Sequence, residues 1–176
     1  MRGVVGGGYD EFWKSKKRYV VCKGSRASKK STTAALKLVV RLMQMPPANA
    51  PVVRQTAATL KDSCYAQLQW AINRLGVEKF WKCTVNPLQM TYIPTGQKIL
   101  FRGMDESLRG RLTEGYYIQW LLTFNPYSSS SWLKARFFDK QSENILAIGA
   151  WKAANISACG ARVCTWSSRL RFRATG

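Results

Sequence analysis

The sequence of 176 residues contains no histidine and only nine acidic residues, against 28 lysines and arginines. Without histidine, neither histidine-based acid–base catalysis nor histidine ligation of a metal is possible. The net charge of +19 favours a polyanionic partner, most simply nucleic acid and alternatively an anionic membrane surface. Because the basic residues are spread along the chain, the same charge is also compatible with an ordinary solvated surface.

Long apolar runs are also missing. No stretch of about 18 apolar residues occurs and the first residues contain no apolar core of a signal peptide, so we expect neither a membrane span nor a secretory leader. The five cysteines are odd in number and show no metal-binding spacing: Cys22, Cys64, Cys83, Cys159 and Cys164. Cys22 and Cys64 fall at apolar positions, so we expect them in the core of one domain in a reducing, intracellular compartment.

One short basic loop organises the rest of the chain. It follows an apolar run at 19–22 and opens a helix-patterned segment, which is the strand–loop–helix layout of a phosphate-binding P-loop. In such a loop the backbone N–H groups and the helix dipole face the phosphates. The loop residues are Gly24, Ser25, Arg26, Ala27, Ser28, Lys29, Lys30, Ser31 and Thr32.

This interpretation gives Lys30 the phosphate contacts and the Ser31 hydroxyl a Mg²⁺ ligand position. Lys29 stands where such loops usually have glycine, so it must adopt a backbone conformation that glycine adopts more easily. The alternative is a basic turn that caps a helix, with Ser28 or Ser31 as the N-cap.

An aromatic cluster lies just upstream of the loop. Tyr9, Phe12 and Trp13 could stack on an adenine ring, or they could cover the edge of the core. The sequence slightly favours the second interpretation.

The remaining pattern alternates strands with helices, which predicts an α/β fold with a mostly parallel sheet flanked by helices and a β-hairpin insertion. The helix at 31–45 is amphipathic, with Lys37 on its polar face. A capping box at Thr59 and Asp62 begins a second helix, and Gly76 follows its end. The other predicted elements are strands at 50–54, 120–124 and 145–148, a hairpin of 91–93 with 98–101, and a helix at 132–138.

Together, these motifs resemble the large subunit of phage terminases, the ATP-driven DNA-packaging motor. The similarity covers residues 8–148 and is highest at 8–13, 23–33, 52–54, 94–105, 122–126 and 132–134. The resemblance implies a P-loop NTPase-type fold and the cofactors ATP and Mg²⁺. It implies as partners double-stranded DNA, a terminase small subunit and the portal protein of the procapsid, and it implies no membrane. The location implied is the cytoplasm of the bacterial host, transiently at the portal.

The resemblance also assigns roles to residues. Gly24 to Thr32 is similar to the Walker A loop, with Lys30 and Arg26 as catalytic cations and Ser31 on Mg²⁺. Tyr9, Phe12 and Trp13 look like the adenine-side segment. Thr123 and Asn125, at the end of a strand, look like the motif that couples hydrolysis to movement.

Two departures from the family pattern lead us to expect an incomplete ATPase domain. No apolar strand runs directly into an Asp-Glu pair, as a Walker B strand does, and Asp105-Glu106 follows Arg102-Gly103-Met104 instead. We therefore expect an internal deletion near 105–107. No acidic residue follows Glu143, so the acidic cluster of the family's nuclease domain is absent.

We therefore divide the chain into a partial ATPase domain at 1–148 and a basic tail at 149–176 that is disordered or out of frame. Three functions remain open: a weakly active packaging ATPase, a non-catalytic basic DNA-binding remnant, and an unrelated P-loop protein such as a kinase. The match at 123–126 argues against the third.

Overall fold

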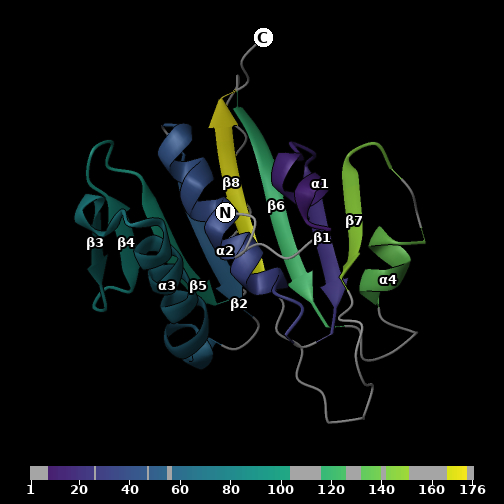
Figure 1. Cartoon of the computed structure of the whole chain (residues 1–176), viewed down its shortest axis with the longest axis horizontal. Helices are drawn as coiled ribbons and strands as arrows, with labels where there is room; N and C mark the ends of the chain where they lie inside the picture. Colours follow the sequence, from purple (N-terminus) through teal and green to yellow (C-terminus); the bar gives the residue numbers. More distant parts are fainter. Residues whose placement is uncertain are drawn as a thin grey trace.

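The main feature of the computed structural model is an eight-stranded sheet with the order β3-β4-β5-β2-β8-β6-β1-β7 (Figure 1). The structure describes residues 8–25, 27–46, 48–54, 57–103, 116–125, 132–139, 142–150 and 166–173. The strands are β1 (Tyr19–Gly24), β2 (Ala50–Arg54), β3 (Trp81–Thr84), β4 (Gln89–Tyr92), β5 (Lys98–Gly103), β6 (Tyr116–Phe124), β7 (Ile145–Ala150) and β8 (Trp166–Arg173).

Strand directions confirm the predicted mostly parallel sheet. β1 pairs in parallel with β6 on one side and with β7 on the other, and β2 pairs in parallel with β5. Only β4 and β8 run opposite to the remaining strands among those described. The P-loop strand β1 therefore lies inside the sheet, with β6 and β7 as its neighbours. It does not pair with β2, to which α2 connects it.

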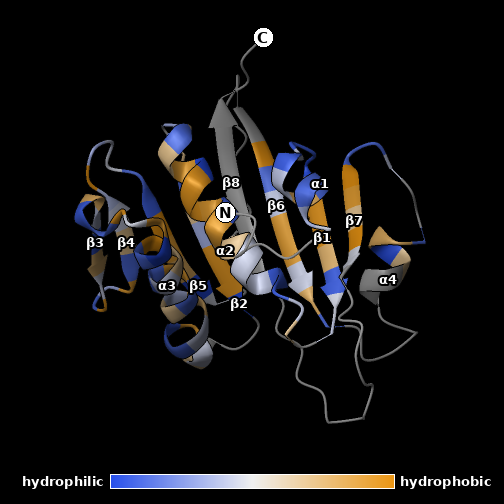
Figure 2. Cartoon of the chain, viewed as in Figure 1, coloured by the Kyte–Doolittle hydropathy of each residue, from blue (hydrophilic) through white to orange (hydrophobic). Residues whose placement is uncertain are grey.

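Helices cover both faces of the sheet. The described α-helices are α1 (Asp10–Lys14), α2 (Lys30–Gln44), α3 (Ala66–Leu75) and α4 (Trp132–Phe137). Neighbouring residues of a strand face opposite sides, so Val20 and Cys22 join one apolar cluster with α2 and α3, while Val21 joins a second cluster with Phe137 of α4. Figure 2 shows the apolar character of much of β1, β7 and α2.

The predicted β-hairpin is formed by β4 and β5, which pair antiparallel. Gly96 adopts a φ of 71° in the turn, a conformation that glycine reaches without steric cost. The Gln97 amide donates to the carbonyl of Met45 at 3.1 Å, and this bond ties the hairpin to the end of α2. The hairpin therefore extends the sheet at a distance from the P-loop.

The second helix differs from its prediction at the start. A single helix from Thr59 is replaced by a 3₁₀ turn at Ala57–Thr59 and a π-helical turn at Lys61–Tyr65, followed by α3. The capping box is not formed, because Ser63 Oγ donates to the Thr59 carbonyl at 2.6 Å and no side chain caps the helical turn. Gly76 ends α3 with a φ of 67°, as predicted.

The tail at 149–176 was expected to be disordered or out of frame. Residues 166–173 are ordered, because they form β8 between β2 and β6, and their origin stays a prediction. Eight residues of β8 pair with β6 from Tyr116 to Thr123, and two pair with Val52 and Val53 of β2. β8 thereby provides backbone hydrogen-bond partners to β2 on one side and to β6 on the other.

A further expectation concerned membranes. None of the helices in the described part of the chain has the length and apolar content needed to cross a bilayer.

Candidate nucleotide-binding site

The P-loop lies where β1 ends and α2 begins, and its backbone has the strained form that the sequence implied. Lys29 is the N-cap of α2 and adopts a left-handed conformation, with φ 62° and ψ 10°. Ala27 has a φ of 61° as well. The alternative of a serine-capped helix is wrong, because Lys29 holds the N-cap position and no side chain caps α2. Alternating conformations of this kind turn successive N–H groups toward an anion.

Lys30 is held inside the loop that it would serve. Its Nζ donates to the Ser25 carbonyl at 2.9 Å, and its side chain is only 8% exposed. Lys29 is exposed. Thus the two neighbouring lysines have different surroundings: Lys30 is fixed toward the loop, while Lys29 extends toward solvent.

The thiol of Cys22 lies beneath the loop. Burial raises its pKa to about 11, although a hydrogen bond with Tyr9 and the charge of Lys30 act in the opposite direction. The thiol therefore stays protonated at neutral pH, and Cys22 is a core residue as predicted, not a nucleophile. Cys64 is buried too.

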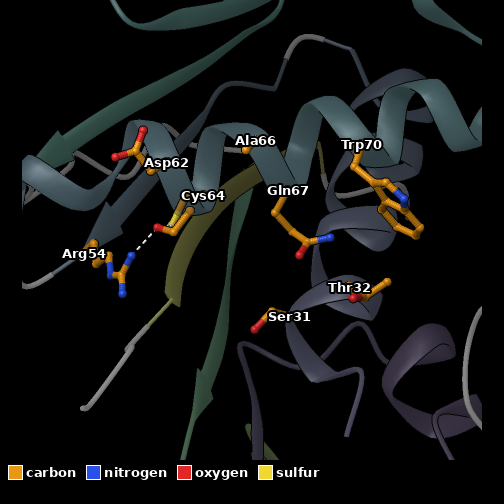
Figure 3. A pocket seen from close by; sticks show the side chains of 9 residues that line it. Ser31, Thr32, Arg54, Asp62, Cys64, Ala66, Gln67 and Trp70 are labelled. Atoms are coloured by element: carbon orange, nitrogen blue, oxygen red, sulfur yellow. Dashed lines mark hydrogen bonds between the residues drawn. The ribbon is translucent and has the colours of Figure 1, made fainter. Parts of the chain in front are cut away.

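A cleft of about 620 Å³ opens beside the first turn of α2. Ser31 and Thr32 lie on one side, and Gln67 and Trp70 project toward them from α3 (Figure 3). Its remaining lining residues are Arg54, Asp62, Ser63, Cys64 and Ala66. The predicted Mg²⁺ ligand, Ser31, is thus accessible.

The acidic residue of this cleft does not face Ser31. Asp62 projects from the opposite side of its helical turn in Figure 3. Arg54, at the end of β2, donates to Ser63 Oγ and to the Thr59 carbonyl. The cleft therefore contains hydroxyls and a guanidinium, and its single carboxylate points away from Ser31.

The two predicted coupling residues lie beside the P-loop strand. Thr123 of β6 is in register with Cys22 of β1, two residues before Gly24. Its hydroxyl is buried and has no hydrogen-bond partner in the described part of the chain. Asn125 directly follows the carboxyl end of β6. Ligands of open α/β sheets bind at the carboxyl ends of strands, so these residues share the edge of the sheet with the P-loop.

The aromatic cluster mainly forms core. Phe12 is fully buried, Tyr9 is 3% exposed, and Trp13 packs against the same cluster while partly exposed. Phe12 therefore offers no free ring face to a nucleobase in this conformation. The interpretation that these rings cover the edge of the core fits the observed burial.

Several predicted residues lie outside the described parts of the chain: Arg26, Asp105, Glu106 and Glu114. Among the described residues, no three cysteine or carboxylate side chains come together as a metal centre. The loop fits phosphate groups through its amides and Lys30. For Mg²⁺, the loop offers the Ser31 hydroxyl. The strand β8 adds no carboxylate ligand, because its sequence contains no aspartate or glutamate.

The predicted position of Lys37 on an exposed helix face is wrong. Lys37 was placed on the polar face of its helix, but it is 1% exposed and its Nζ donates to the carbonyls of Phe12 and Ser15. Gln119 of β6 donates to the same Ser15 carbonyl at 3.1 Å and to that of Lys17 at 2.9 Å. No local pattern identifies these residues, because their partners are backbone atoms that lie far away along the chain.

A P-loop between a central parallel strand and a helix, with polar residues at the end of the neighbouring parallel strand, defines a P-loop NTPase-type α/β domain. The family of phage terminase large subunits matches residues 16–121. The chain belongs to this family.

Two curated relatives have names that agree with this assignment. The chain is 41% identical over 101 residues to the terminase large subunit of Bacillus phage SPP1, covering 54% of this chain and 24% of that protein. It is 30% identical over 109 residues to the PBSX phage terminase large subunit of Bacillus subtilis strain 168, covering 62% of this chain and 24% of that protein. Each match thus spans about a quarter of the relative's length.

Proposed function

We propose that this chain binds ATP with Mg²⁺ at residues 24–32, as part of the ATPase region of a phage DNA-packaging motor. The observation that carries the proposal is the conformation of the P-loop, with Lys29 in the left-handed region and Lys30 directed into the loop. Lys30 and Arg26 would stabilise charge on the phosphates, and Ser31 would ligate the metal. Trp13, as the partly exposed ring, is the member of the aromatic cluster best placed to contact a base.

The proposed role in packaging extends the family assignment to partners. Thr123 and Asn125 would couple the nucleotide state to movement of double-stranded DNA. The terminase small subunit and the procapsid portal would be the protein partners, in the host cytoplasm. The net charge of +19 supports the choice of a polyanion as substrate.

The proposal is tested by replacing the two lysines of the loop separately. Lys30→Ala should abolish binding of a fluorescent ATP analogue, because it removes the cation that is fixed toward the phosphate position. Lys29→Ala should weaken binding by about tenfold or less, since an exposed charge is screened by solvent. Equal losses for both variants would refute this division of roles.

A second candidate is a basic DNA-binding remnant that no longer hydrolyses ATP. It is favoured by the strand β8, which lies between β2 and β6 and whose sequence has three arginines and no acidic residue. We propose that β8 takes the place of a Walker B strand lost through an internal deletion near 105–107. The motor role would then be reduced to binding.

DNA binding in either case should be independent of sequence and driven by phosphate contacts. With Z contacts, the logarithm of the association constant should fall against the logarithm of salt concentration with a slope of about −0.9Z. Fluorescence anisotropy with duplex DNA at several salt concentrations measures this slope. An affinity that does not change with salt would remove the electrostatic basis of both candidates.

A further inference from the structure

The P-loop contains an unusual pair of strained residues with one residue between them. Ala27 and Lys29 have φ values of 61° and 62°, and neither is a glycine. The left-handed conformation is sterically unfavourable for a residue that carries a Cβ atom. Such strain persists only where surrounding contacts enforce it. Ser28, between the two, is therefore the place to look for those contacts.

Ser28 is held at two of its atoms. Its Oγ donates to the Ser25 carbonyl at 2.9 Å inside the loop. Its backbone carbonyl accepts a hydrogen bond of 2.5 Å from the Tyr9 hydroxyl, which comes from outside the loop. Tyr9 is nineteen positions away in the sequence and 3% exposed, so the second bond is long-range and partly buried.

Tyr9 is itself fixed by the short helix that follows it. The Trp13 amide donates to the Tyr9 carbonyl at 2.9 Å, and the Tyr9 and Phe12 rings meet edge-to-face with centroids 6.1 Å apart. Lys37 then binds the carbonyls of Phe12 and Ser15 from α2. The helix that begins at the P-loop thus anchors the segment that carries the Tyr9 hydroxyl.

The hydroxyl remains a donor throughout the useful pH range. Burial raises the pKa of Tyr9 to about 12. The bond to Ser28 is therefore present at neutral pH without any need for a charged partner.

The peptide group between Ser28 and Lys29 connects this bond to the ligand. A trans peptide is planar, and its C=O and N–H point in opposite directions. When Tyr9 holds the Ser28 carbonyl on one side, the Lys29 N–H is directed to the other side. Amides directed in this way form the anion-binding concavity of a P-loop.

We propose that Tyr9 is a positioning residue for the P-loop, whose hydroxyl orients the Ser28–Lys29 peptide toward the phosphates. This inference rests on the proposed nucleotide binding and gives Tyr9 a role different from contact with adenine. Because the effect passes through the loop, it applies to any polyphosphate, whether or not a base is attached.

The test uses Tyr9→Phe, which removes the hydroxyl and keeps the ring. Affinities for ATP and for inorganic tripolyphosphate are measured by calorimetry in the wild-type chain and the variant. We expect both affinities to fall by the same factor, roughly five- to tenfold, as the loss of one partly buried hydrogen bond allows. Tyr65→Phe is the matched control, because that buried ring packs against Phe101 of β5, a strand that does not pair with the P-loop strand β1.

Each outcome separates the alternatives. Unchanged affinities in Tyr9→Phe overturn the positioning role, and so does a loss confined to ATP, which would indicate contact with the base. An equal loss in Tyr65→Phe would indicate a general effect of core hydroxyls and overturns it too. A wild-type chain that binds neither ligand overturns the proposed nucleotide binding instead. Bound tripolyphosphate should protect the Lys29 amide from hydrogen exchange in the wild-type chain and in Tyr65→Phe, and this protection should be weaker in Tyr9→Phe alone.

Discussion

The P-loop corner and the neighbouring slot between β2 and β6 are built very differently. At the corner, long-range side-chain bonds from Tyr9 and Lys37 hold a strained loop and its helix. The slot contains a strand, β8, that pairs antiparallel with both neighbours. Its sequence is basic and has no carboxylate. We therefore expect the proposed phosphate binding, which would use only the corner, to be separable from hydrolysis, which would also use a carboxylate from a strand between β2 and β6.

The largest effect should come from removing β8 from between β2 and β6. Removal of residues 151–176 deletes β8 and leaves the backbone groups of β2 and β6 without partners, so we expect loss of cooperative thermal unfolding. Calorimetry measures this change. Removal of 174–176 alone leaves β8 whole and should have little effect. A truncated chain with an unchanged Tm would show that β8 contributes nothing to the fold.

The next effect concerns turnover. We expect ATP hydrolysis to be slower than in a complete active site by a factor of about 10² to 10³, because the sequence of β8 offers no carboxylate to position the attacking water. Steady-state phosphate release, with DNA present, measures the rate.

Three acidic residues lie in the part of the sequence where the family pattern would place a Walker B strand: Asp105, Glu106 and Glu114. Asp105→Ala and Glu106→Ala should therefore leave the slow rate unchanged. A wild-type rate of about one per second that falls sharply in either variant would contradict this prediction. Asp105 and Glu106 would then serve as the Walker B carboxylates, and hydrolysis would not lack its acidic group.

A smaller effect should come from the buried amine of Lys37, which makes the stability of the fold depend on pH. Burial, with a contribution from the charge of Arg41, lowers the pKa of Lys37 from 10.5 to about 7. The folded state therefore disfavours the protonated amine, and the free energy of unfolding should rise as pH increases from 7 to 9, by about 2 kcal/mol. Chemical denaturation at several pH values measures it.

Lys37→Met provides the control for this rise, because it keeps the length of the side chain and removes the ionisable group. Its stability should not increase between pH 7 and 9. The raised pKa values of Tyr9 and Cys22 act in the opposite direction, because stability falls as the pH passes their unfolded values of 10.0 and 9.0. Cys22 therefore offsets a small part of the rise as the pH approaches 9. A rise of equal size in Lys37→Met would place its origin elsewhere.

The smallest effect concerns strain in the loop. Lys29→Gly should raise the free energy of unfolding by about 1 kcal/mol, because glycine adopts the left-handed conformation without steric cost. The loss of the exposed cation should still weaken nucleotide binding slightly. Denaturation and titration on one variant measure both. Lys30→Gly, at the first helical position, should lower the free energy of unfolding instead. A change of the same sign in both glycine variants would contradict the strain at Lys29.

Local patterns predicted much of this molecule. The strand at 19–22, the helix that follows, the hairpin around Gly96 and the glycine at the end of α3 were all found close to their predicted positions. The place of Lys29 in a P-loop pattern predicted its backbone conformation. These features depend on residues close together in the chain, where hydrophobic period and turn chemistry act directly.

The sequence by itself determined the loop, its cations, the α/β class and the absence of an acidic residue after Glu143. Only the tertiary structure decided which groups hold the loop and what fills the slot. The Tyr9 hydroxyl and the Lys37 amine bind backbone carbonyls distant in sequence, and such carbonyls occur at every position, so no residue pattern marks them. The pairing of 166–173 follows the same logic: a strand recruited by two open neighbours needs free N–H and C=O groups more than a particular sequence.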